Sequence, residues 1–401
     1  RDCLLSRGLG DVYKRQDEST SLENYSGISY TVPGSYTFQP TVTGEYQIDI
    51  SGAGGGGGGA MVGGTDLLDT YKKLHPEKPV ELTLLETCDM DPEAYGAVTA
   101  GMGAPTVLKN VDFSQYAVNA FNALKEMGAK MDPPRKLEYS VPVELGGFNT
   151  FCPMLISLLN DIPFIDCDGA GRAVPALDTL LLHINGLDTS PLAMADGKNN
   201  KVTIELNDAK DAPMGEEIGR WICTAFGQIA GLSGWMVRKS DIEESLPCGT
   251  VTLCEKIGHE LRRCAKDGSN AFEALAQAGI ECRFLTRGKV VKQENLQAKG
   301  FDYGKVYVEG ADGQWIIYFQ NENLLVEHEG KPIMTVPDIT CYYNAATGEP
   351  LTNADITEGM EICLGAIKAP DAWWKNPNMF DVWKPFLSNV GYEGGNIPFT
   401  K

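Results

Sequence analysis

The sequence predicts an α/β protein in two parts: a three-layer α/β/α domain, then a β-rich, barrel-like domain. Strand-like and helix-like segments alternate up to residue 168, which is typical of a three-layer domain with a mainly parallel sheet. From residue 174 onward, short strand-like runs are separated by Gly, Asn, Asp and Pro, as in barrels and sandwiches. A chain of 401 residues is also too long for one ordinary core. We therefore predict an α/β domain at residues 51–173 and a barrel-like domain at residues 174–401.

The N-terminal end carries two unusual segments. Residues 6–16, SRGLGDVYKRQ, can be encoded residue for residue by the end of a common transposase sequencing adapter. We predict that residues 1–16 are adapter-derived read-through from a metagenomic assembly. Residues 17–50 are rich in Thr and Tyr, punctuated by Gly and Pro, which indicates β-hairpins. The sequence leaves open whether this β-rich segment belongs to the same gene as the rest.

The first domain follows from hydrophobic periodicity. Leu67, Leu68, Tyr71 and Leu74 recur at helical spacing after Thr65, a residue type typical of N-caps. The same criteria predict, in order, strands at 80–86 and 95–107, a helix at 113–128, a strand at 137–150, a helix at 153–160 and a strand at 162–168. The glycine run at 51–64 matches a dinucleotide-binding loop only trivially. A nucleotide is therefore disfavoured, which leaves a loop lining another ligand or a purely structural run.

The second domain is predicted from short strands. Strand-like runs lie at 201–206, 234–238, 288–293, 305–310, 314–320, 323–328, 333–344 and 360–367. Two helix-like segments, at 216–226 and 254–266, interrupt them. Regular short strands with turn residues between them indicate a barrel packed against the first domain.

The composition excludes several classes of function. The chain has 34 Lys and Arg against 54 Asp and Glu, a formal net charge of -20, which disfavours nucleic acid and anionic membranes as partners. Its 11 cysteines include no CxxC pair, so we expect buried thiols in a reducing compartment rather than a zinc ribbon. The sequence shows no signal-peptide pattern, and we expect a cytoplasmic bacterial protein.

Three glycine-containing loops follow strands of the first domain: GMGAPT, ELGGFN and DCDGAGR. Ligands of parallel sheets bind beyond the carboxyl ends of the strands, so we expect these loops to form a site in the cleft between the domains. Glycine permits close approach and unusual backbone angles. Gly147, Gly169 and Gly171 are therefore predicted to line the substrate site.

Two aspartates, Asp166 and Asp168, bracket a cysteine at the end of the last predicted strand. Close carboxylates push their pKa values apart and leave one as a base at neutral pH. These residues are thus candidates for a catalytic acid/base pair or a divalent-cation site. In the structural interpretation, one of them caps the following turn. Glu144 is a third candidate catalytic acid, and its structural alternative is a solvated strand residue.

The candidate substrate-binding residues come from both domains. The planar guanidinium of Arg172 suits a carboxylate or a ring carbonyl, whereas its structural alternative is an ion pair with Asp166 or Asp168. Asn149 is a candidate donor to a ring carbonyl. In the second domain, Asn321 and Glu322 belong to the polar run QNEN, which predicts either a wall of the site or a network between the domains.

Cysteine and histidine chemistry is not predicted. The four histidines show no pairing with Cys152 or Cys167, so a buried structural thiol is favoured over a nucleophile or a zinc ligand. The sequence leaves the metal unknown, with a divalent cation as the remaining candidate.

The segments ELGGFN, IDCDGAGRAVPAL, FQNENLLV and VPDITCYY, in that order, resemble the S-methyl thiohydantoin desulfurase-like family. This former family of unknown function is often found beside hydantoinase/oxoprolinase proteins. The resemblance covers about residues 50–401 and implies an α/β domain, a C-terminal β-barrel and hydrolytic removal of sulfur from a thiohydantoin ring. The chain departs from the family pattern at Ala176, where a Glu is usual, and before the glycine loop, where a β segment replaces a helix.

We therefore expect a small-molecule hydrolase acting on a thiohydantoin- or hydantoin-like ring. Asp166 or Asp168 would activate water, directly or through a cation, while Arg172 and Asn149 would hold the ring carbonyl. The alternative is a non-catalytic ligand-binding or accessory subunit of a hydantoinase/oxoprolinase system. The expected partners are a small-molecule substrate, such an oxoprolinase-type protein and a second copy of the chain.

Overall fold

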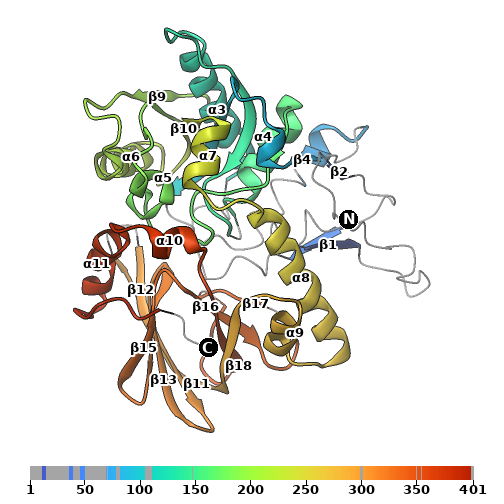
Figure 1. Cartoon of the computed structure of the whole chain (residues 1–401), viewed down its shortest axis with the longest axis vertical. Coiled ribbons are helices and arrows are strands. Elements are labelled where there is room, and N and C mark those ends of the chain that lie inside the picture. The colour runs from blue at the N-terminus through green and yellow to red at the C-terminus, as the bar shows by residue number, and fades with distance from the viewer. Residues whose placement is uncertain are drawn as a thin grey trace.

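The computed structural model describes residues 11–14, 36–38, 46–49, 69, 71–77, 82–103, 111–146, 148–298, 301–348, 350–353 and 355–398. They form a mixed α/β protein with two eight-stranded sheets. Figure 1 shows the first sheet and its helices above the second, with α10 (Asp371–Lys375) between them. A small additional sheet pairs β1 (Asp11–Lys14) with β3 (Tyr46–Asp49).

The first sheet has the order β2-β4-β7-β6-β5-β10-β8-β9. Its parallel neighbours are β4 (Leu82–Leu85), β7 (Phe164–Ile165), β6 (Leu137–Pro142) and β5 (Tyr95–Gly103). The strands added antiparallel are β2 (Tyr36–Phe38), β10 (Ile229–Val237), β8 (Leu192–Ala195) and β9 (Lys201–Ile204). The predicted parallel arrangement therefore holds for half of the sheet.

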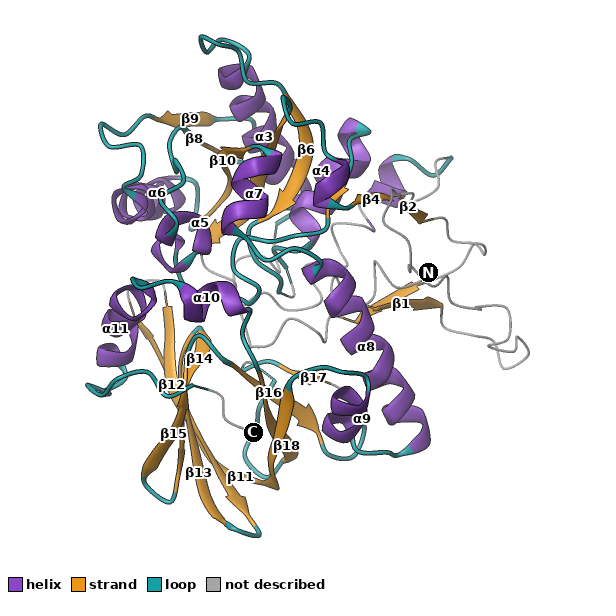
Figure 2. Cartoon of the chain, in the orientation of Figure 1, coloured by secondary structure: helices purple, strands orange, loops and turns teal. Residues whose placement is uncertain are grey.

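Helices cover both faces of this sheet, because successive residues of a strand point to opposite sides. Ala97 of β5 packs with residues of α3 (Ser114–Gly128) and α4 (Phe151–Asn160). Its neighbour Val98 belongs to the cluster that contains α5 (Leu181–Ile184) and α6 (Ala212–Ala225). Figure 2 shows the strands between these two groups of helices.

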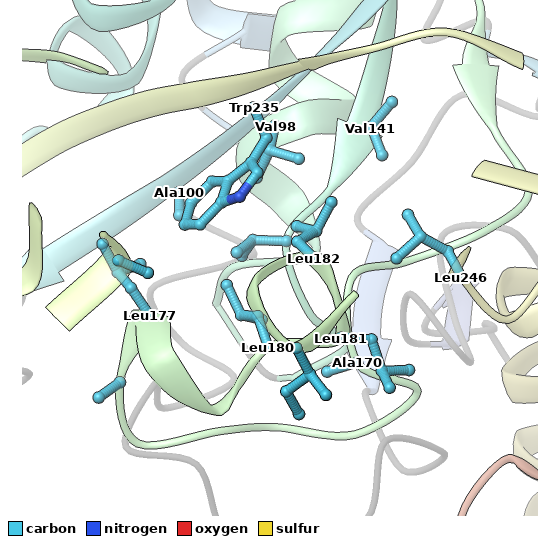
Figure 3. Packing of buried hydrophobic residues seen from close by; sticks show 14 of the residues in the cluster. Val98, Ala100, Val141, Ala170, Leu177, Leu180, Leu181, Leu182, Trp235 and Leu246 are labelled. Atoms are coloured by element: carbon cyan, nitrogen blue, oxygen red, sulfur yellow. The ribbon is translucent and has the colours of Figure 1, made fainter. Parts of the chain in front are cut away.

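The cluster around Val98 also holds the turn that follows β7. Figure 3 shows Ala170, from this turn, beside Leu180 and Leu181, with Trp235 of β10 on the sheet side. The same cluster continues into the second half of the chain through Trp373 and other residues. Because one core spans both sheets, the turn after β7 is held between the two parts of the molecule.

The second sheet has the order β15-β14-β13-β12-β11-β18-β16-β17, with antiparallel neighbours throughout. Its strands are β11 (Cys282–Ala298), β12 (Phe301–Gly310), β13 (Gly313–Gln320), β14 (Glu322–His328), β15 (Lys331–Thr335), β16 (Ile339–Asn344), β17 (Pro350–Leu351) and β18 (Glu361–Ile367). Among the described residues no pairing joins β15 to β17. A barrel-like closure therefore stays a prediction.

The change from first to second sheet comes later than the predicted boundary at residue 173. Strands β8, β9 and β10 all follow that residue and yet pair within the first sheet, and the second sheet begins at β11. An antiparallel strand shows the same alternation of side chains in either sheet. The pattern predicted β9 and the end of β10 but not β8, and it could not assign any of them to a sheet.

The remaining helical elements are the 3-10 turns η2 (Thr87–Asp89) and η3 (Leu177–Thr179), and the helices α7 (Lys239–Ser245), α8 (Thr250–Asp267), α9 (Ala271–Gln277) and α11 (Met379–Asn389). Of these, α7, α8 and α9 lie along the chain between β10 of the first sheet and β11 of the second. Within the described chain, none of the helices has the length and apolar character needed to cross a membrane.

Candidate functional site

Asp166 lies directly after β7 and caps a helix that begins far away in the sequence. Its side chain is only 4% exposed and accepts hydrogen bonds from the Val251 N–H (2.9 Å), the Thr252 N–H (3.1 Å) and the Thr252 hydroxyl (2.5 Å). These donors belong to the first turn of α8. A carboxylate there accepts hydrogen bonds from N–H groups that have no partner within the helix, and it interacts favourably with the positive end of the helix dipole. Burial raises the pKa of Asp166, and the bonds from Thr252 and Val251 lower it.

Asp168 holds the turn DGAGR together from inside. Its carboxyl is fully buried, and Oδ2 accepts hydrogen bonds from the Ala170 N–H (3.1 Å) and the Gly171 N–H (2.6 Å). Gly171 has φ +68°, a conformation that favours glycine. Oδ1 has no hydrogen-bond partner of normal geometry in the described chain, although the Thr250 hydroxyl is near enough to lower the pKa. Burial is the larger effect and raises this pKa to about 7.

We predict that Asp168 makes the protein less stable as the pH rises. Its folded pKa of about 7 lies above the ordinary value of 3.8, so its contribution to stability is fully present below the unfolded pKa and is lost as the pH rises through 7. Each pKa unit by which the folded value exceeds the unfolded value corresponds to about 1.4 kcal/mol of folding free energy. Urea unfolding between pH 4 and 8 should therefore show a flatter pH dependence for Asp168→Asn than for the wild type. An unchanged slope would contradict the buried, protonated state.

Arg172 crosses from this turn into the second domain. The side chain is fully buried, with Nε donating to the Ala173 carbonyl (2.9 Å), Nη1 to the Pro337 (2.7 Å) and Asp338 (3.1 Å) carbonyls and Nη2 to the Asn323 carbonyl (3.3 Å). Four of the five guanidinium N–H groups are thus occupied. The guanidinium also lies 5.1 Å from the centre of the Trp383 ring. Its hydrogen-bond partners are these carbonyls rather than Asp166 or Asp168, which corrects the ion pair considered from the sequence.

Glu144 and Asn149 form a hydrogen-bonded unit beside Arg172. The Asn149 amide donates to Glu144 Oε1 (2.7 Å) and accepts from the Gly101 N–H (2.8 Å). The Val174 N–H donates to Glu144 Oε2 (2.5 Å). Burial raises the pKa of Glu144, while the Asn149 and Val174 bonds and the Arg172 charge lower it. The loops ELGGFN and GMGAPT therefore meet at this point, as the sequence predicted.

Glu322 comes from the second domain and lies near enough to Glu144 for the charge of Glu144 to raise its pKa. It begins β14, is 3% exposed, and its Oε2 has no hydrogen-bond partner among the described residues. Burial raises its pKa well above the ordinary value. The charge of Glu144 raises it further, whereas Arg172 and Arg220 lower it. The two domains thus bring together two carboxyl groups with raised pKa values, Glu144 and Glu322, which we call the carboxyl pair.

Arg220 is a member of this group that the sequence analysis did not single out. Its Nε donates to Glu216 Oε1 at 2.6 Å, one helical turn away on α6. Its guanidinium lies 5.0 Å from the centre of the Phe301 ring of β12. Burial lowers the pKa of Arg172 to about 10, so two cations border the carboxyl pair at neutral pH. The Glu-x-x-x-Arg spacing in α6 was the available signal.

The other predicted site residues have different positions. Asn321 has φ 56° and exchanges hydrogen bonds with Asp302, accepting from its N–H and donating to its carbonyl, so it shapes the connection between β13 and β14. A side chain at Gly169 would collide with the Val143 carbonyl and Leu182. Close packing is therefore a sufficient reason for glycine at this position. Gly147 and the glycine run at 51–64 lie outside the described residues.

A separate cavity of about 440 Å³ opens beyond the carboxyl ends of β4 and β7. Asp166, Glu86 and Glu243 bring carboxylates to its wall, and Cys88 and Cys248 bring thiols. Among the described residues, no cluster of three or more His, Cys, Asp or Glu side chains is arranged to hold a metal ion.

Comparison with known proteins identifies the family. The family model of the S-Me-THD-like N-terminal domain matches residues 50–206, and that of the S-Me-THD-like C-terminal domain matches residues 210–393. The chain belongs to the S-Me-THD-like family, which is the S-methyl thiohydantoin desulfurase-like family. The family boundary lies between β9 and α6, so β10 pairs with the N-terminal sheet although it falls within the C-terminal S-Me-THD-like domain.

One solved structure shows the fold of this S-Me-THD-like chain. The crystal structure of a protein from Chromobacterium violaceum covers 86% of this chain and 94% of its own, with 23% sequence identity and a TM-score of 0.73. At this identity the likeness concerns the fold alone. No curated protein matches the chain.

Proposed function

We propose that this S-Me-THD-like protein is a hydrolase that removes the sulfur substituent from an S-methyl thiohydantoin or a similar ring. The observation that carries the proposal is the carboxyl pair. Glu322 is buried, with a raised pKa and an oxygen that lacks a hydrogen-bond partner among the described residues. Glu144 is half-buried and is held by two donors. Two carboxyl groups whose environments separate their pKa values are the usual arrangement for general acid and general base.

In the proposed reaction, Glu144 takes a proton from water as the water oxygen bonds to the ring carbon that bears sulfur. The carbon–sulfur bond then breaks, and Glu322 gives its proton to the leaving methanethiolate. The hydroxyl proton moves from the ring carbon's oxygen to the ring nitrogen, which gives methanethiol and the ring carbonyl compound. The proton on Glu144 is then exchanged through solvent for the one that Glu322 has lost. Arg172 and Arg220 would stabilise the negative charge that develops between the two carboxyl groups.

This proposal changes the roles that the sequence gave to the aspartates. Asp166 accepts hydrogen bonds from the first turn of α8 with both oxygens, and Asp168 accepts from the turn backbone with Oδ2. Within the described chain, Arg172 keeps one N–H for a ligand, and the Asn149 amide already donates to Glu144. We therefore propose Asp166, Asp168 and Asn149 as positioning residues and the carboxyl pair as the catalytic residues.

The same hydrogen bonds favour one alternative, a ligand-binding or accessory subunit of a hydantoinase/oxoprolinase system. Six polar residues predicted for the site have side-chain partners inside the fold, as expected of a structural network between domains. They are Asp166, Asp168, Glu144, Arg172, Asn149 and Asn321. In that case Glu322 would bind a ring N–H or carbonyl without chemistry. The two proposals differ in whether the carbon–sulfur bond breaks.

The test offers S-methyl thiohydantoins with different 5-substituents to the full chain and follows thiol release with a thiol-reactive dye. We expect release that depends on enzyme concentration and persists with chelator. Release that chelator abolishes would assign water activation to a cation instead of Glu144. Thermal stabilisation by the ring compound without any thiol release would overturn the hydrolase and support the binding subunit.

A further inference from the structure

Cys167 and Cys248 face each other across two backbone segments. They form an isolated antiparallel bridge, and the Gly249 N–H donates to the Asp166 carbonyl at 2.7 Å. That bond joins the residue before Cys167 to the residue after Cys248, so the two cysteines are a non-hydrogen-bonded pair. The Cα atoms of such pairs are about 4.5 Å apart, with their side chains close together. Disulfides span Cα distances of about 4.4–6.8 Å, so this backbone geometry already suits one.

The two thiols are free and differ in their access to solvent. Cys167 is buried, whereas Cys248 is exposed on the wall of the cavity beyond β4 and β7. Among the described residues, the Cys248 sulfur makes only two long hydrogen bonds. It accepts from the Thr87 hydroxyl at 3.5 Å and donates to the Leu246 carbonyl at 3.8 Å. Rotation about its Cα–Cβ bond can therefore turn the sulfur toward Cys167. The cavity gives a small oxidant a route to this thiol.

We propose that Cys167 and Cys248 form an intramolecular disulfide when the protein meets a peroxide. The Cys248 thiolate attacks one peroxide oxygen, which forms the S–O bond, breaks the O–O bond and releases hydroxide that is protonated to water. The Cys167 thiol then attacks the resulting sulfenic acid, the S–S bond forms, and the second water leaves with the Cys167 proton. Both thiols are oxidised, and one peroxide is reduced to two waters.

The disulfide would covalently join the turn that carries Asp166, Asp168 and Arg172 to the start of α8. It closes a long loop in the unfolded chain, and disulfides stabilise more as the closed loop lengthens. We therefore expect a rise in Tm of several degrees on oxidation. Burial and the charges of Asp166 and Glu243 raise the pKa of Cys248, so the rate of crosslinking should increase from neutral to alkaline pH.

The experiment treats the full chain with hydrogen peroxide, blocks the remaining thiols under denaturing conditions, and maps linked peptides by mass spectrometry. A peptide pair joining Cys167 to Cys248 and a Tm rise reversed by dithiothreitol are expected. Cys248→Ser, a change at an exposed site, should lose both. Cys88→Ser, from the same cavity wall, should keep both.

Three results would overturn the proposal. They are a link between Cys248 and Cys88, a Cys248 that ends as sulfinic acid without any crosslink, and a Tm rise that survives in Cys248→Ser. Because none of these readouts depends on thiohydantoin chemistry, the disulfide can fail or succeed independently of the proposed hydrolase.

Discussion

Glu322→Gln is expected to lower kcat/KM for methanethiol release by roughly 10²–10⁴-fold, the usual contribution of a general acid. Glutamine keeps the size of the side chain and is uncharged, like the protonated form of Glu322. It lacks an acidic proton that could be given to the leaving thiolate. The raised pKa and the oxygen without a hydrogen-bond partner in the described chain are what point to this proton donor.

The matched control is Glu309→Gln, an exposed glutamate on β12 of the same sheet. It should release thiol at the wild-type rate. Both variants should unfold at urea concentrations close to that of the wild type. If Glu322→Gln kept full activity, Glu322 would be a structural residue and the proposed acid would have to be sought elsewhere.

Arg172→Met is expected to lower the free energy of unfolding by about 3–5 kcal/mol. This is the range observed when one member of a buried ion pair is removed and its partners are left uncompensated. Methionine fills much of the volume but donates no hydrogen bond. The Ala173, Pro337, Asp338 and Asn323 carbonyls would lose their donor, and the carboxyl pair would lose its buried cation. Chemical unfolding followed by circular dichroism measures this loss.

Arg263→Met provides the comparison, since Arg263 is a half-exposed residue of α8 that pairs with Glu260 and Asp267. Exposed ion pairs contribute about 0–1 kcal/mol, so this variant should remain near the wild type. Equal losses in the two variants would show that Arg172 does not hold the domains together.

Part of the order of strands and helices was predictable because hydrophobic periodicity is local, although β8 and several helices, among them α7 and α11, were not predicted. Helix α3 and strands β4, β5 and β6 lie within or close to their predicted ranges. The sheet to which β8, β9 and β10 belong was not predictable, since an antiparallel edge strand carries no mark of its neighbour. The helix expected at 113–128 is observed at 114–128, and the change of sheet falls between β10 and β11, later in the chain than the boundary predicted at residue 173.

The role of the candidate site residues stays a prediction, although their positions in the structure can be compared with what the sequence suggested. Glu144, Asn149, Arg172 and Glu322 were all singled out, and the structure brings them together. Three of the four carbonyl partners of Arg172 lie more than 150 positions away along the chain, and no local pattern reveals such a contact. The paired aspartates were predicted to be catalytic because ligands bind beyond the carboxyl ends of strands. In the structure, Asp166 accepts hydrogen bonds from the first turn of α8, and Asp168 accepts them from the backbone of its own turn.

The pH profile of thiol release tests the carboxyl pair most directly. Because Glu144 must be ionised to accept a proton, kcat/KM of the wild type should fall on the acid side at a pH above the ordinary range of a glutamic acid. Glu144→Gln should show a low rate without this acid limb, and Asp166→Asn should keep the limb at reduced stability. An acid limb that persists in Glu144→Gln and vanishes in Asp166→Asn would contradict the account and return catalysis to the turn after β7.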